Sequence, residues 1–262
     1  MNSDGTPHIA GSSHSRTART VSARPARRTL LRTALSGAAV IGAGVGTGLA
    51  VAAPASAATA TRTSTAPRPS TPQQALSALA TGNQRWRTFR QHHPNETATV
   101  RQQLVASQHP FALVLGCIDS RVPPELVFDQ GLGDLMTVRS GGEVLDEAVL
   151  GSVAYGVLEL AIPLVVVLGH QSCGAVRAAV EAEESGERLP AHIQYLADQI
   201  TPAIDHTKEG DARVDATIDA QVRLVTSRLA AEPDLAAKVN SGQLAIVGAR
   251  YELNTYLVHQ LV

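Results

Sequence analysis

This sequence has few cysteines and few aromatic residues, and its positive and negative charges nearly balance. Its 262 residues include 2 Cys, 3% aromatic residues and a formal net charge of −1. Two cysteines exclude a disulfide-stapled scaffold, and the composition matches neither a collagen-like repeat nor a protein with many membrane spans. What is present is 44% hydrophobic residues, enough to bury the core of one or two soluble globular domains.

The small net charge hides an asymmetry along the chain. Residues 1–57 hold six Arg and one acidic residue, whereas residues 58–262 hold 16 basic and 22 acidic residues. An acidic body lacks the basic surface that DNA or RNA binding requires. We therefore expect no nucleic-acid partner.

The N-terminal segment has the three parts of a cleavable export signal. Arg27 and Arg28 precede an uncharged run, Thr33–Ala53, and the small-residue site Ala55-Ser56-Ala57 follows. Paired arginines resemble a twin-arginine signal, whose route carries folded proteins. An uncleaved membrane anchor is the alternative, since about 20 residues can span a bilayer, but Ala and Gly make poor anchors. We expect a signal peptide over 1–57, an exported protein, and no stable membrane span after cleavage.

The mature chain is predicted to be a disordered linker, 58–70, followed by one domain, 71–262. Thr71 and Pro72 together predict the start of a helix. Short apolar runs bounded by Gly or Pro suit strands that helices cover on both faces; they are 111–115, 135–138, 164–168 and 244–247. Apolar residues at helical spacing predict further helices at 144–160, 174–184, 191–204 and 215–231. The fold class is therefore α/β, with an open, mainly parallel sheet flanked by helices.

Both cysteines follow predicted strands, where ligands of open α/β sheets bind. Cys117, Asp119 and Arg121 come after the first apolar run, and His170 and Cys173 come after the third. In an exported protein the two cysteines suit a disulfide, and two buried apolar thiols are a second interpretation. The third is a metal site, because Cys117, His170 and Cys173 offer a ligand set that zinc accepts with one position left open.

Two segments carry a family resemblance. GCIDSRVPPE, which begins at Gly116, and LGHQSCGA, which begins at Leu168, resemble the two signatures of the β-class carbonic anhydrases. The resemblance extends from about residue 75 to about residue 251. It implies a zinc enzyme that interconverts carbon dioxide and bicarbonate, with an α/β fold and a zinc site at the C-terminal ends of the strands. It also implies a homodimer or homotetramer.

Position by position, the resemblance makes Cys117, His170 and Cys173 the Zn²⁺ ligands and Asp119 with Arg121 the catalytic dyad. Asp119 has two possible roles, because a carboxylate two residues from a ligand can occupy the open position as a fourth ligand in a closed state or accept a hydrogen bond there. A guanidinium fork at Arg121 holds a carboxylate away from the metal. Gly174 is expected to begin a helix whose N–H groups favour thiolate at Cys173, or to serve only tight packing.

Hydration of carbon dioxide needs hydroxide, which zinc supplies by lowering the pKa of its bound water from 15.7 to about 7 in well-known cases. Two thiolates cancel the charge of zinc, so this centre should be a weaker Lewis acid. We therefore expect activity to rise toward mildly alkaline pH.

The sequence departs from the family after Arg139, where Ala-Gly-Asn is common and this chain has Ser140-Gly141-Gly142-Glu143. Two other functions stay open. The chain could hydrolyse a related linear substrate, carbon disulfide or carbonyl sulfide, or it could be a non-catalytic protein stabilised by zinc or by a disulfide.

Overall fold

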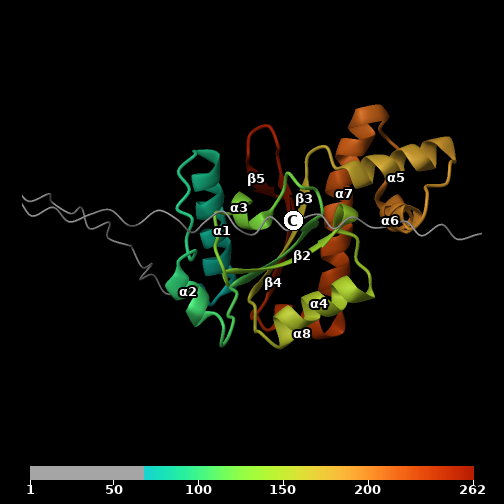
Figure 1. Cartoon of the computed structure of the whole chain (residues 1–262). Coiled ribbons are helices and arrows are strands. Elements are labelled where there is room, and N and C mark those ends of the chain that lie inside the picture. The colour runs from blue at the N-terminus through green and yellow to red at the C-terminus, as the bar shows by residue number, and fades with distance from the viewer. Residues whose placement is uncertain (1–67) are drawn as a thin grey trace, which may run out of the picture. The chain divides into compact units, whose positions relative to one another are not determined.

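The centre of the fold is a five-stranded sheet with the strand order β2-β1-β3-β4-β5 (Figure 1). The computed structural model describes residues 68–262. The strands are β1 (Ala112–Cys117), β2 (Leu135–Ser140), β3 (Leu164–His170), β4 (Ala245–Tyr251) and β5 (Val258–Gln260). The first four run parallel to their neighbours, and only β5 pairs antiparallel, with β4. The predicted open, mainly parallel sheet is confirmed.

Helices cover both faces of this sheet. The described residues contain eight α-helices. They are α1 (Pro72–Arg87), α2 (Ala98–Gln103), α3 (Pro124–Val127), α4 (Glu147–Leu158), α5 (Gly174–Ser185), α6 (Ile193–Ile200), α7 (Gly210–Ala231) and α8 (Pro233–Asn240). Alternate side chains of a strand point to opposite faces. Val114 and Val166 therefore pack with α1 and α3, whereas Leu115 and Val167 pack with α4, α7 and α8.

Local sequence signals explain several helix ends. The Thr71 hydroxyl accepts a hydrogen bond from the Gln74 N–H and Pro72 occupies the first turn of α1, as predicted. Asp146 caps α4 in the same way through the Val149 N–H, so this helix begins three residues later than the apolar spacing predicts. Pro202 lies in a short 3-10 segment, Thr201–Ala203, that ends the helical region after α6.

Several elements differ from the sequence prediction. Helix α7 begins at Gly210, five residues before the predicted start. The short elements α2, α3, α8 and β5 have too few residues to give a clear apolar period. Arg68 belongs to the predicted linker and here donates a hydrogen bond to the Asp134 carboxylate at 2.8 Å. The predicted signal peptide lies outside the described residues.

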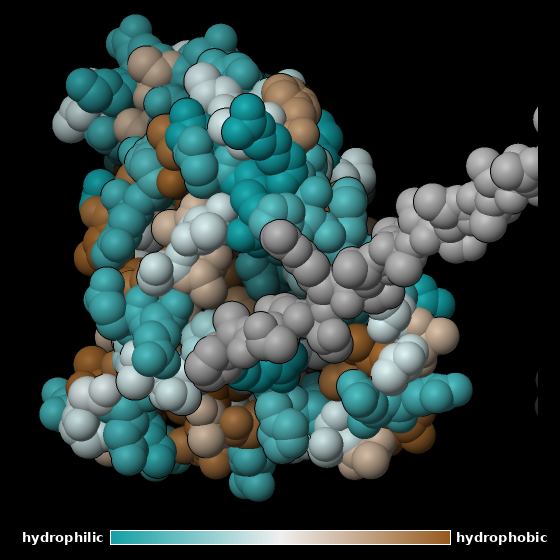
Figure 2. All heavy atoms as spheres, turned by 90° about the vertical axis from the view of Figure 1, so that its left-hand side faces the viewer, coloured by the Kyte–Doolittle hydropathy of each residue, from teal (hydrophilic) through white to brown (hydrophobic). Residues whose placement is uncertain are grey.

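The face that carries α1 and α2 mixes hydrophilic and hydrophobic residues (Figure 2). Among residues 68–262, no helix combines the length and the apolar content needed to cross a membrane.

Candidate metal centre

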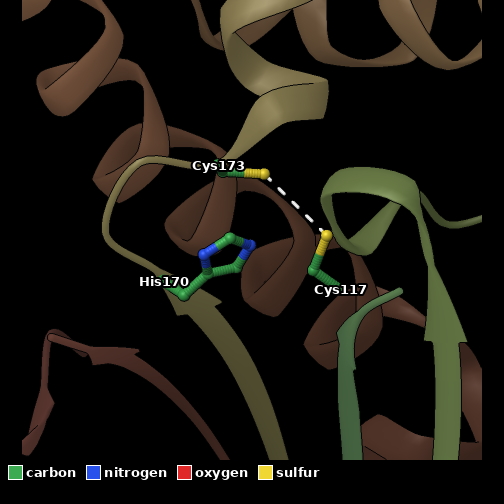
Figure 3. A group of neighbouring side chains, drawn as sticks. All are labelled: Cys117, His170 and Cys173. Atoms are coloured by element: carbon green, nitrogen blue, oxygen red, sulfur yellow. Dashed lines mark hydrogen bonds between the residues drawn. The ribbon is translucent and has the colours of Figure 1, made fainter. Parts of the chain in front are cut away.

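Three predicted ligand residues converge at the carboxyl end of the sheet (Figure 3). Cys117 is the last residue of β1, His170 is the last residue of β3, and Cys173 is the N-cap of α5. One ligand atom from each residue lies within 4.8 Å of the others, and the two sulfurs are 3.9 Å apart. Parallel pairing of β1 with β3 places the two strand ends side by side. The two strands and the helix start therefore build the cluster.

Backbone contact orients the imidazole of His170. Its Nδ1 lies 2.9 Å from the Gln171 carbonyl oxygen, which only accepts hydrogen bonds, so Nδ1 carries the proton. The other nitrogen, Nε2, is buried and has no hydrogen-bond partner among the described residues. A buried polar atom without a partner is costly. A lone pair on Nε2 next to two thiols is the arrangement that a histidine metal ligand requires.

The two thiols differ in how readily they ionise. The hydrogen bond between the two thiols, helped by the Gly142 N–H at 3.5 Å, lowers the pKa of Cys117 below its usual range. The same bond, together with burial, raises the pKa of Cys173, although the Val176 N–H at the start of α5 acts in the opposite direction. The shared hydrogen bond favours a thiolate at Cys117, and a divalent cation can displace the remaining proton of the pair.

These residues fit zinc. Two thiolates bound tetrahedrally at about 2.3 Å from a common ion are about 3.8 Å apart, and the observed separation of the sulfurs is 3.9 Å. Both cysteines are free and buried. The disulfide that the sequence left open is therefore not formed.

Asp119 and Arg121 lie in the turn that follows β1 and bind each other. Asp119 Oδ1 accepts hydrogen bonds from the backbone N–H and the Nε of Arg121, both at 2.9 Å, and Oδ2 accepts one from Nη2 at 2.7 Å. These bonds lower the pKa of Asp119 to about 2. Oδ2 also lies 3.9 Å from Nε2 of His170. The structure therefore brings both predicted dyad residues to the edge of the cluster.

Glu143 is a second carboxyl group near the thiols, and the sequence did not predict its state. Only 1% of the residue is exposed, and its Oε1 has no hydrogen-bond partner among the described residues. Burial raises the pKa of Glu143 well above its usual range, and the neighbouring Cys117 adds to the effect. The position is also strained, because its φ is 55°. The Gly-Gly-Glu departure was the only sequence signal for this group.

Two glycines near the cluster have different roles. Gly142 has a φ of 67°, and a Cβ there would lie 2.8 Å from a side-chain carbon of Ile200, so the loop requires glycine. A Cβ at Gly174 would meet nothing within 4 Å, so tight packing does not explain this residue. Helix α5 begins at Gly174 as predicted.

Comparisons with known proteins agree with this geometry. The family model described as carbonic anhydrase matches residues 112–258. Carbonic anhydrase 2 of Mycobacterium tuberculosis is 41% identical over 187 residues, which cover 71% of this chain and 90% of the relative. A carbonic anhydrase of Mycolicibacterium smegmatis is also 41% identical, over 70% of this chain and 90% of the relative.

A solved structure shows the same fold. The β-carbonic anhydrase of Coccomyxa, determined in complex with acetazolamide, superposes with a TM-score of 0.58 and 26% identity, covering 71% of this chain and 86% of that chain. The family match includes β1, β3 and the start of α5, which position Cys117, His170 and Cys173. The chain therefore belongs to the carbonic anhydrase family, as a zinc enzyme of the β class.

Proposed function

We propose that this enzyme catalyses the reversible hydration of carbon dioxide to bicarbonate with zinc held by Cys117, His170 and Cys173. The observation that carries the proposal is the convergence of two thiol sulfurs and a buried, unpartnered Nε2 within 4.8 Å. Zinc in such a three-ligand site supplies a nucleophile derived from water at near-neutral pH.

Asp119 and Arg121 form the proposed catalytic dyad. With a pKa of about 2, Asp119 stays a carboxylate at every pH at which the enzyme would work. Arg121 fixes its orientation through three hydrogen bonds and is itself held by the Ser172 carbonyl oxygen at 3.3 Å. Oδ2 is then placed to accept a hydrogen bond from a hydroxyl group beside the cluster, which orients that hydroxyl for attack on carbon dioxide.

Stopped-flow carbon dioxide hydration by the mature protein, beside a metal assay of the same sample, tests the proposal. We expect fast hydration with about one zinc per chain, and activity that rises toward mildly alkaline pH because two thiolates weaken the Lewis acidity of zinc. The variant C173S should lose both zinc and activity. Bound zinc without hydration would overturn the proposal, and competition with carbon disulfide or carbonyl sulfide would then test the related linear substrates.

We also propose that the enzyme acts outside the cytoplasm. Support comes from the leader sequence, with Arg27-Arg28, the uncharged run Thr33–Ala53 and the Ala55-Ser56-Ala57 site. We expect cell fractionation to find the protein outside the cytoplasm, with a mature N-terminus near Ala58, and the double variant R27K/R28K to stay inside. Cytoplasmic retention of the wild type would contradict this proposal.

A homodimer or homotetramer is the proposed assembly. Strand β2 has a neighbour on one side only, β1, so its other edge is unpaired within the described residues. Leu126 and Leu132 are exposed large apolar side chains, both in the segment between β1 and β2. An unpaired edge beside exposed apolar residues suits a second copy of the chain. Light scattering of the holoenzyme should give two or four chains, and a monomer at micromolar concentration would contradict this.

A further inference from the structure

Arg139 extends from β2 across the end of β1. Its Nε donates a hydrogen bond to the Cys117 carbonyl oxygen at 2.8 Å, and its Nη2 donates one to the Asp119 carbonyl oxygen at 2.6 Å. A longer contact of 3.5 Å joins Nη2 to the carbonyl oxygen of Val122. The parallel register pairs Arg139 with Gly116. The backbone of Arg139 therefore lies next to the residues whose carbonyl groups its side chain binds.

These carbonyl groups belong to the turn that carries the proposed catalytic residues. The strand ladder ends with the Ile118 N–H, which donates to the Ser140 carbonyl oxygen, and the chain then turns at a hydrogen bond from the Val122 N–H to the Asp119 carbonyl oxygen. Arg139 is the side chain that ties both Cys117 and Asp119 to the neighbouring strand.

The dyad has one long contact of its own with the loop after β3, a hydrogen bond from Arg121 Nη2 to the Ser172 carbonyl oxygen at 3.3 Å. Asp119 and Arg121 are two residues apart, so the hydrogen bonds between them fix their mutual orientation within the turn. The 3.9 Å separation between Asp119 Oδ2 and His170 Nε2 depends instead on where the whole turn lies relative to β3. The two shorter contacts that anchor the backbone of the turn, from Arg139, therefore help to set this distance.

An arginine suits that anchoring for a geometric reason. The guanidinium is planar, and its Nε–H and one Nη–H point in the same direction, so one side chain can bind two carbonyl oxygens of one turn. The ammonium of a lysine concentrates its donors at a single atom, which cannot reproduce this fork.

We propose that Arg139 is a positioning residue for carbon dioxide hydration, which acts by holding the turn of Asp119 and Arg121 at its working distance from the metal cluster. The proposal rests on the proposed function of that dyad. A displacement of about 1 Å in a catalytic group can cost about 100-fold in rate. Loss of Arg139 should therefore reduce kcat without removing the metal ligands.

The experiment compares the zinc-loaded variants R139A and R139K with wild type. We expect kcat to fall by about 10- to 100-fold in both, KM to change little, and the zinc content and melting temperature to stay near wild type. Millimolar guanidinium should restore part of the rate of R139A and leave R139K and wild type unchanged, with sodium chloride as the ionic-strength control. The matched control is R223A, since Arg223 also donates to a backbone carbonyl, that of Leu261 at 2.7 Å, and its loss should leave the rate unchanged.

A double variant shows whether Arg139 acts through Asp119. If it does, R139A/D119N should be no slower than D119N alone. A wild-type rate in R139A, or a rate that falls only in proportion to lost zinc or lost fold, would overturn the inference. Additive losses in the double variant would also overturn it. An inactive wild type with bound zinc would instead overturn the proposed function, so the two failures can be distinguished.

Discussion

The loops after β1 and β2 each place one carboxyl group near the same thiols, but the two groups are in opposite states. Asp119 in the first loop has a side chain that is 15% exposed and accepts three hydrogen bonds from Arg121. Glu143 in the second loop is 1% exposed, and its Oε1 has no partner among the described residues. Solvent and a guanidinium favour the charged form of the first group, whereas burial favours the neutral form of the second.

This difference gives the two groups opposite effects on stability as pH changes. The pKa of Asp119 is lowered from 3.8 to about 2, so its stabilising contribution is present above about pH 4 and is lost as pH falls toward 2. The pKa of Glu143 is raised above 4.5, so the unfolded chain ionises first and stability is lost as pH rises above that value. Only the Asp119 loop offers a permanent negative charge to the reaction.

Removal of the Asp119 charge should lower the rate of hydration more than any other change proposed here. D119N should reduce carbon dioxide hydration by about 100- to 1,000-fold, because the amide carries no charge and cannot accept every hydrogen bond that Arg121 donates. Stopped-flow rates and the zinc content of the same sample provide the measurement. A rate within threefold of wild type would remove Asp119 from the dyad.

Loss of Arg121, the partner of Asp119, should lower the hydration rate nearly as much. R121A frees the Asp119 carboxylate to occupy the open position of the metal site, so we expect hydration to fall by about 100-fold with zinc still bound. In the metal-free variant, acid denaturation should begin at higher pH than in metal-free wild type, because without the Arg121 side chain the pKa of Asp119 returns toward 3.8. If the variant keeps the wild-type rate, the guanidinium does not control the carboxylate.

A substitution at Glu143, in the loop after β2, should change the stability of the fold more than the hydration rate. E143Q replaces a carboxyl group whose neutral form the fold favours, so its melting temperature should exceed that of wild type by roughly 5 °C at pH 8 and match it near pH 4. Hydration should stay within about threefold. Calorimetry across this pH range makes the measurement, and a gain that is constant with pH would show that Glu143 is ionised in the fold.

The smallest effect is expected at the start of α5. G174A should leave the rate and the zinc content unchanged and stabilise the fold by about 0.5 kcal/mol, because the added Cβ meets nothing within 4 Å. Thermal denaturation and a rate assay test this. Weaker zinc binding would instead show that the backbone beside Cys173 needs the freedom of glycine.

The sequence predicted the parallel sheet and its covering helices because long elements carry a clear signal. The runs that became β1 and β3 are buried along their whole length, and such strands consist of consecutive apolar residues. Short elements such as β5, with three residues, have no readable period and were missed. The observed helix ends differ from the predicted ones by a few residues where a capping side chain, such as Asp146, fixes the first residue of the helix.

Residue type and spacing at the ends of apolar runs made Cys117, His170 and Cys173 a candidate ligand set for zinc. The resemblance to the β-class carbonic anhydrases added Asp119 and Arg121 as the dyad. The states of these groups follow from the three-dimensional packing of the chain. The tautomer of His170, the burial of Glu143 and the two carbonyl bonds of Arg139 depend on atoms from different elements. Such contacts form only when strands pair in register and helices pack, so no local pattern of residues encodes them.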